Sequence, residues 1–96
     1  MPTYEWTTRF GAEWRRLSED QQRAFLAVVA RFVAGLRAGP VDPRLRVHRV
    51  QRLRGVWEIT WAPYGRATFE YGREHQPGDP HVIWRRIGDH SILDQP

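Results

Sequence analysis

The spacing of apolar residues changes once along this chain, at Asp42-Pro43, from a helical period to a period of two. Before this point apolar side chains recur at intervals of three and four, which places them on one face of a helix. After it apolar and polar residues alternate, as they do in strands that bury one face. The chain is therefore predicted to be an α+β domain, with two N-terminal helices packed on one face of a four-stranded, mainly antiparallel sheet.

Two helices are predicted before the change, over residues 7–17 and 19–38. In the first, Phe10 and Trp14 lie four residues apart on one helical face. A Ser-x-x-Gln capping box at Ser18 marks the start of the second helix, because its side chains satisfy free backbone N–H groups there. A Gly-Pro pair directly after the second helix ends it.

Four strands are predicted after the change. The tight Ala-Pro-Tyr-Gly connection at residues 62–65 predicts that the middle two strands pair as an antiparallel hairpin. The Gly- and Pro-rich segment 72–80 is interpreted as an exposed loop. The predicted strands span residues 44–50, 56–61, 66–71 and 81–87.

Length and composition limit the class of protein. A chain of 96 residues with 41% hydrophobic content supports one core, and so one domain over residues 1–96. The absence of Cys excludes disulfides and thiolate metal sites. Arg31 interrupts the longest apolar run, which is too short for a bilayer that needs about 20 apolar residues. With no features of a secretory signal at the start, we expect a soluble cytoplasmic protein without a membrane partner.

The charge of the chain comes from arginine. All 15 of its Lys and Arg residues are Arg, against 11 acids, which gives a net charge of +4. A high-GC genome would produce the same preference for arginine. Because the guanidinium fork pairs with phosphate through two bonds, the balance is also compatible with nucleic acid or an acidic protein as partner.

The segment 44–54 concentrates this charge, with five Arg, one His and no acid. Like charges this close repel one another, so a polyanion such as RNA would bind favourably, largely through counterion release. A solvated basic edge that prevents strand-to-strand aggregation is an equally good interpretation. The predicted RNA-binding residues are Arg44, Arg46, His48, Arg49, Arg52 and Arg54, with Arg85 on the last strand.

Side-chain alternation assigns the strand residues to two faces of the sheet. The aromatic residues of the two middle strands then face the helices. On the last strand we expect Ile83 and Ile87 in the core and Trp84 on the opposite side. Strict alternation would also bury Arg85, so a bulge or a strand end is predicted there.

The sheet face that the helices leave open is predicted to be polar and concave. One interpretation is a catalytic surface, and the other is a solvated face with cross-strand ion pairs, which antiparallel sheets often show. The candidate catalytic residues on this face are Glu58, Arg66, Glu70, Arg86 and His90.

These residue types suit cleavage of RNA without a metal. The reaction needs a base for the 2′-hydroxyl proton, cations for the phosphate and an acid for the 5′-oxygen. His90 is the predicted acid or base, since imidazole titrates near neutral pH. Arg66 and Arg86 are the predicted phosphate clamps, and Glu58 or Glu70 either holds an arginine or acts as base. The four His have no metal-ligand spacing, so we expect no metal and no cofactor.

Several short motifs follow the two predicted helices in order. They are Gly-x-Trp-Glu at 55–58, Gly-Arg-Ala at 65–67 and Arg-x-Gly-x-His-Ser at 86–91. This order resembles the RelE/ParE superfamily of type II toxin-antitoxin toxins over nearly the whole chain. The last motif is especially similar to the YafQ-like mRNA interferases.

The resemblance implies an endoribonuclease that inhibits translation by cleaving mRNA, often in the ribosomal A site, and that is controlled by a partner antitoxin. It implies a catalytic role for His90 and RNA contacts for Arg66 and Arg86. Gln51 and Tyr64 stand where YafQ-like proteins have further histidines, so the site would contain one histidine. Two other functions stay open: a gyrase-directed toxin without catalysis, as in the ParE branch, and an inactive binding protein with the RelE fold.

Overall fold

The computed structural model describes all 96 residues and contains one sheet, two α-helices and two short 3-10 helices, named η1 and η2. The elements follow the chain as β1 (Thr3–Trp6), α1 (Thr8–Arg16), α2 (Glu19–Ala38), η1 (Pro43–Leu45), β2 (His48–Arg49), β3 (Val56–Thr60), β4 (Gly65–Gly72), β5 (His81–Asp89) and η2 (His90–Asp94).

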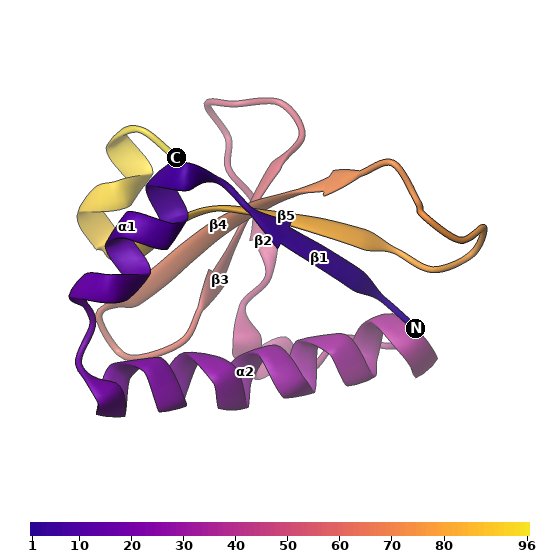
Figure 1. Cartoon of the computed structure of the whole chain (residues 1–96), viewed down its shortest axis with the longest axis horizontal. Helices are drawn as coiled ribbons and strands as arrows, with labels where there is room; N and C mark the ends of the chain where they lie inside the picture. Colours follow the sequence, from indigo (N-terminus) through magenta and orange to yellow (C-terminus); the bar gives the residue numbers. More distant parts are fainter.

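The sheet has five strands in the order β1-β5-β4-β3-β2. β1 lies parallel to β5, and all other neighbours are antiparallel. Figure 1 shows α2 crossing one face of the sheet, with α1 at the end of β5. The α+β class with two packed helices is as predicted, but β1 is an additional strand. At four residues, with Tyr4 and Trp6 exposed, it is too short to give a clear strand pattern.

α2 begins at the predicted residue 19, and α1 begins one residue after its predicted start. The capping box before α2 forms in both directions, since Gln21 N–H donates to Ser18 Oγ (3.2 Å) and Ser18 N–H donates to Gln21 Oε1 (2.9 Å). At the start of α1 the hydroxyl of Thr7 accepts from Phe10 N–H at 3.1 Å. Neither helix combines the length and the apolar character that a bilayer crossing requires.

The predicted strand over residues 44–50 is wrong for most of its length. Its first residues belong to η1, which the side chain of Asp42 caps. Arg46 then adopts a φ of 53°, in the left-handed region that an extended strand excludes. Only the two residues of β2 pair with β3, whereas the β3–β4 hairpin forms as predicted.

β5 contains the bulge predicted at Arg85. The sides predicted for Ile83 and Trp84 are wrong, whereas those predicted for Arg86 and Ile87 are confirmed. β4 has no residue opposite Arg85, so Arg85 is the inserted residue. The insertion interrupts the alternation of side chains. Trp84 and Ile87 therefore both lie in the core, while Ile83 shares the opposite face with Arg86.

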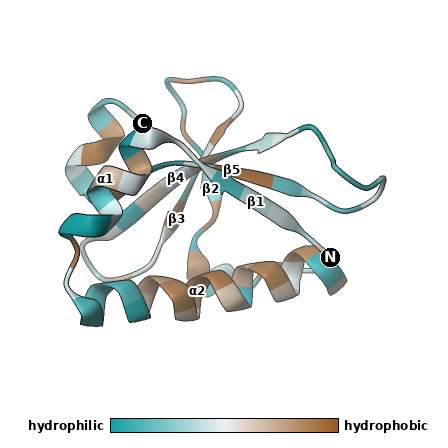
Figure 2. Ribbon diagram, in the orientation of Figure 1, coloured by the Kyte–Doolittle hydropathy of each residue, from teal (hydrophilic) through white to brown (hydrophobic).

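The core lies between α2 and the sheet and is largely aromatic. Trp84 is central to it, with its ring centroid 5.1 Å from that of Phe25 on α2 and 5.2 Å from that of Phe69 on β4. Figure 2 shows hydrophobic residues along the middle of α2 and on the strands beside it. Because truncation of a buried aromatic side chain costs about 3–5 kcal/mol, these rings fix the position of α2 on the sheet.

Two helix glycines are expected to respond in opposite ways to replacement by alanine. A Cβ at Gly11 would approach no neighbouring side chain closer than 3.8 Å, so Gly11→Ala gains about 1 kcal/mol of helix propensity. A Cβ at Gly35 would lie 2.7 Å from Val41 Cα, so Gly35→Ala lowers the free energy of unfolding by about 1–3 kcal/mol. Urea unfolding of the two variants measures both changes, and equal signs would contradict this packing.

Candidate functional site

The sheet face opposite α2, the outer face, is partly covered rather than open as predicted. Residues of η2 pack on it, and Ile92 is buried there. Thr68 in the middle of β4 is fully buried, and its hydroxyl has no hydrogen-bond partner. In Figure 1 η2 is the yellow segment beside the ends of β4 and β5. Two cavities border η2 and the residues after it, and Glu58 and Arg86 of the predicted catalytic residues lie in them.

The first of these cavities is basic. It has a volume of about 410 Å³ and is lined by the side chains of Arg9, Arg85 and Arg86, by Thr7 and by Leu53. The carbonyl groups of the last two residues close one side of it. The predicted cations Arg85 and Arg86 thus meet a third arginine from α1, which the sequence analysis did not identify.

Arg86 is held by a carboxylate from α1. Its guanidinium donates to Glu13 Oε2 at 2.6 Å, and the two side chains are only 13% and 17% exposed. Glu13 Oε1 also accepts from the backbone N–H of Ile87 at 3.3 Å. β1 ends opposite Trp84, so Glu13 takes the place of a neighbouring strand at this N–H. A phosphate that binds Arg86 must compete with this pair.

Arg85, the bulge residue, is also paired. It donates to Glu70 Oε2 at 2.8 Å, and its Nε donates to the carbonyl of Pro96 at 3.2 Å. Arg86 likewise donates to the carbonyl of Gln95 at 2.9 Å. The chain segment after η2 therefore lies across both arginines and occupies part of their hydrogen-bonding capacity.

The second cavity, of about 350 Å³, contains a histidine-carboxylate pair. His48 lies opposite Glu58 across β2 and β3, and its Nε2 is paired with Glu58 Oε1. The other ring nitrogen, Nδ1, faces the carbonyl of Arg46 at 2.8 Å. Each ring nitrogen thus meets an oxygen of the protein, and the ring has no free nitrogen. Glu58, predicted as a base or an arginine partner, instead holds His48.

Arg66 turns back toward its own hairpin. Its guanidinium donates to the carbonyls of Ala62, Pro63 and Gly65, at 3.3, 3.3 and 2.9 Å. These bonds close the β3–β4 turn, so the side chain has a structural role. It remains half-buried at the edge of the outer face.

His90 is the first residue after β5 and the first residue of η2. It is exposed, and its ring makes no hydrogen bond or ion pair. The register pairs Gly65 with Asp89 and Arg66 with Gly88, which brings His90 to the same end of the sheet as Arg66. No bond joins the imidazole to Arg66 or Arg86. The structure thus groups the predicted residues on one face without placing them in one contact cluster.

The other arginines of the basic segment have different surroundings. Arg44 pairs with Asp42 at 3.0 Å, and its hydrogen bonds lower the pKa of that carboxyl below its usual value. Arg49 lies over the ring of Trp57, at 5.2 Å from the centroid. The residues that are exposed without a side-chain partner are Arg46, Arg52 and Arg54.

No group of three His, Asp or Glu side chains is close enough to hold a metal ion. Glu13 is the main residue that the sequence analysis missed. In the sequence Glu13 directly precedes Trp14, so an acid lies beside the apolar face of the first helix. That position was the one sign of its role in the sequence. Its partners lie more than 70 residues later in the chain.

Several solved structures with a similar fold are toxins. A histidine-to-glutamine mutant of YafQ from E. coli gives a TM-score of 0.69 at 10% identity, covering 97% of this chain and 98% of that chain. A chain of the E. coli DinJ-YafQ complex gives 0.62 at 12% identity, with coverage of 97% and 98%. A YoeB/ParE toxin from Agrobacterium tumefaciens gives 0.67 at 11% identity, with coverage of 92% and 98%. No family model and no curated protein matches the sequence.

These similarities extend over nearly all of the chain and of each structure compared. The chain therefore has the same fold as these toxins, which agrees with the fold that the order of its motifs predicted. Identities of 10–12% establish the fold alone.

Asp89 caps the start of η2, directly before His90. Ser91 donates both its hydroxyl and its backbone N–H to Asp89, and these bonds lower the pKa of that carboxyl below the ordinary 3.8. The ionised form is thus favoured by folding. The ionised Asp89 carboxylate contributes its full stabilisation at pH values above its pKa in the unfolded chain. This stabilisation is lost as the pH falls through the lower pKa of the folded protein.

An NMR titration of the Asp89 carboxyl is expected to give a midpoint below 3.8. Ser91→Ala removes the hydroxyl bond and should move this midpoint upward, while the midpoint of Asp42 stays unchanged as an internal control. An Asp89 midpoint that does not respond to Ser91→Ala would show that η2 is not capped in this way.

Proposed function

We propose that this chain is the toxin of a type II toxin-antitoxin pair and that it acts on RNA through its outer face. The observation that carries the proposal is the toxin fold over 97% of the chain, with a free histidine at the end of a face lined by arginines. The net charge of +4 supports a polyanionic substrate. An antitoxin is the expected protein partner, since one of the similar structures is a DinJ-YafQ complex.

His90 is the best placed of the four histidines to move a proton. The rings of His48 and His81 are engaged with carboxylates, and His75 stacks on His81 at 4.1 Å. His90 alone lies exposed with a free ring at an end of the outer face. Both of its nitrogens are therefore available to an RNA hydroxyl.

The proposed reaction is a metal-independent transesterification. His90 takes the proton of a ribose 2′-hydroxyl, and the 2′-oxygen bonds to the adjacent phosphorus as the bond to the 5′-oxygen breaks. The proton passes to the departing 5′-oxygen, which leaves a 2′,3′-cyclic phosphate and a 5′-hydroxyl. Arg66 and Arg86 can only stabilise charge, because guanidinium stays protonated. Both must exchange an intramolecular acceptor for the phosphate.

Cleavage of mRNA, on or off the ribosome, is expected to depend on His90. Incubation of end-labelled RNA with purified protein in EDTA, with and without translating ribosomes, should give new 5′-hydroxyl ends. His90→Gln should lower the rate by about 10²–10⁴-fold, the usual contribution of a general acid or base. Expression of the active protein should also arrest translation.

The matched control is His75→Gln, because His75 is exposed in the loop before β5, at the other end of that strand. Its rate should equal that of the unchanged protein. Full activity in His90→Gln would refute the catalytic assignment.

The three exposed, unpaired arginines of the basic segment are expected to supply the salt-dependent part of RNA binding. Each contact with a single-stranded phosphate contributes about 0.7 to the slope of log affinity against log salt. Replacing Arg46, Arg52 and Arg54 by Gln should thus reduce the slope by about 2. The control with the same net charge replaces Arg23, Arg31 and Arg37 on α2, and a similar loss there would show that the binding surface lies elsewhere.

A second function is favoured by one specific observation. Arg66, Arg85 and Arg86 all have intramolecular partners, so none of these three guanidiniums is free for phosphate. This arrangement fits a protein that binds its target without cleaving it, whether RNA or a protein such as gyrase. In that case toxicity is equal for His90→Gln and the unchanged protein, and the RNA stays intact.

A further inference from the structure

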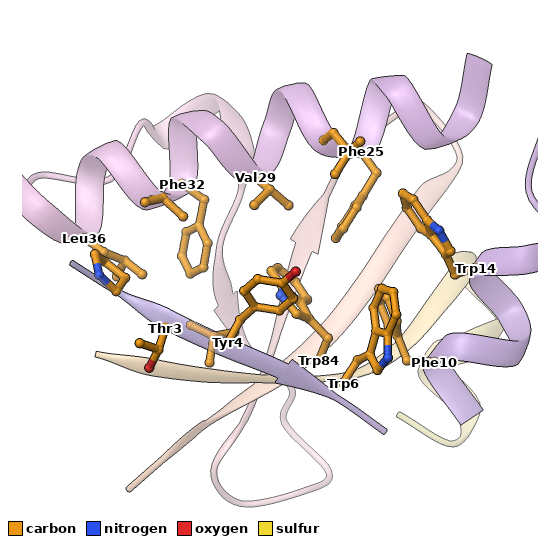
Figure 3. Close-up of a pocket in the computed structure, with 14 residues that line it drawn as sticks. Thr3, Tyr4, Trp6, Phe10, Trp14, Phe25, Val29, Phe32, Leu36 and Trp84 are labelled. Carbon is orange, nitrogen blue, oxygen red and sulfur yellow. The ribbon is translucent and has the colours of Figure 1, made fainter. Parts of the chain in front are cut away.

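An apolar groove runs between the edge strand β1 and helix α2, on the opposite side of the sheet from His90. Its cavity is about 160 Å³ in volume and almost entirely apolar in lining. Figure 3 shows Tyr4 and Trp6 of β1 along one side and Phe25, Val29 and Phe32 of α2 along the other. An empty apolar cavity of about 150 Å³ is large enough to take a benzene molecule. One leucine or phenylalanine side chain would therefore fit here.

Helix α2 carries two apolar stripes, and only one of them is fully buried. The first, which includes Phe25 and Phe32, is buried against the sheet. The second lies next to it, at helical spacings of three and four, and lines the groove. Its first member, Leu26, is 56% exposed. The residues of this second stripe are Leu26, Val29, Val33 and Leu36.

The other side of the groove is an open strand edge. Thr3 N–H donates to Pro80 and Thr7 N–H donates to Trp84, so alternate residues of β1 point their backbone groups toward β5. The N–H and C=O groups of Tyr4 and Trp6 consequently point away from the sheet. β1 is the outermost strand, and no further strand pairs with this edge.

The side chains of this edge do not prevent it from pairing with another strand. Tyr4 and Trp6 are 69% and 47% exposed and lie on the α2 side, since their register partners Val82 and Trp84 are in the core. The only charge on β1 is Glu5, which points to the other face and bonds to His81 Nε2 at 2.7 Å. Edge strands that must stay unpaired usually carry charges or proline to prevent association. This edge has neither at its two outward-facing positions.

We propose that the β1 edge and the groove form a site for β-strand addition by another protein. An extended segment pairs with the backbone groups of Tyr4 and Trp6, and its alternate side chains, which must be apolar, enter the groove beneath the second stripe of α2. A helix would fill the groove but satisfies its own backbone, so it would leave the edge unpaired. The open edge therefore selects an extended partner. This site uses none of the proposed catalytic residues.

A phage-displayed library of random 12-residue peptides, selected on the folded protein, tests the class of partner. We expect the enriched peptides to carry apolar residues at every second position. One such peptide, synthesised as the probe, should slow hydrogen exchange of the Tyr4 and Trp6 amides. Leu26→Asp should weaken its binding about tenfold or more, since one buried charge exceeds 1.4 kcal/mol.

The matched control is Ala27→Asp, an exposed position on the other side of α2, which should leave binding unchanged. The exchange measurement uses the unchanged protein and does not depend on how Leu26→Asp folds. Enriched peptides with spacings of three and four, no enrichment at all, or unchanged exchange at Tyr4 and Trp6 would each overturn the proposal. A dimer in sedimentation that Leu26→Asp dissociates would instead assign the groove to a second copy of the chain, and would overturn it too.

Discussion

One inserted residue in β5 determines which side chains each face of the sheet presents. With Arg85 as the extra residue, Trp84 and Ile87 both point into the core. Strict alternation would have placed one of them outside and one arginine inside. A buried unpaired guanidinium costs several kcal/mol, and a core without its central tryptophan loses about 3–5 kcal/mol, so the regular strand is the less stable alternative. The bulge also places two adjacent arginines on the outer face.

The two adjacent arginines of that face are neutralised within the molecule. Glu13 and Glu70 each neutralise one of the adjacent arginines, and carbonyls of the last two residues take further donors. Because the Glu13 pair is shielded from water, its geometry is held more firmly than that of a surface ion pair. The face is therefore rigid before any ligand arrives, and anion binding there is an exchange of partners.

Local signals in the sequence were sufficient for the helices and the hairpin. A capping box, a Gly-Pro stop and a tight turn each act over a few residues, and all three form as predicted. Features that depend on distant partners were not predictable in the same way. β1 is recognisable only once β5 lies beside it, and the strand proposed after Pro43 was lost to a turn capped by Asp42.

The candidate site follows the same division. Alternation on β3 and β4 correctly placed Glu58 and Arg66 away from the helices, and His90 is exposed as expected. The partners of these residues could not be read from the sequence. Glu58 holds His48, Arg66 binds its own turn, and Arg86 binds an acid 73 residues earlier. The roles assigned to them in catalysis stay predictions.

The pairing of β1 with β5 has a consequence for how the chain is made. These strands are nearly 80 residues apart, and the hydroxyl of Thr7 bonds the carbonyl of Arg85 across the same gap of 78. During synthesis the first strand and both helices emerge long before the strand that must lie between β1 and β4. The ring of Trp84, around which the core is packed, is made after both helices and the β3–β4 hairpin. The sheet thus cannot be completed until β5 has been synthesised, and the pairing of β1 is a late, long-range step of folding.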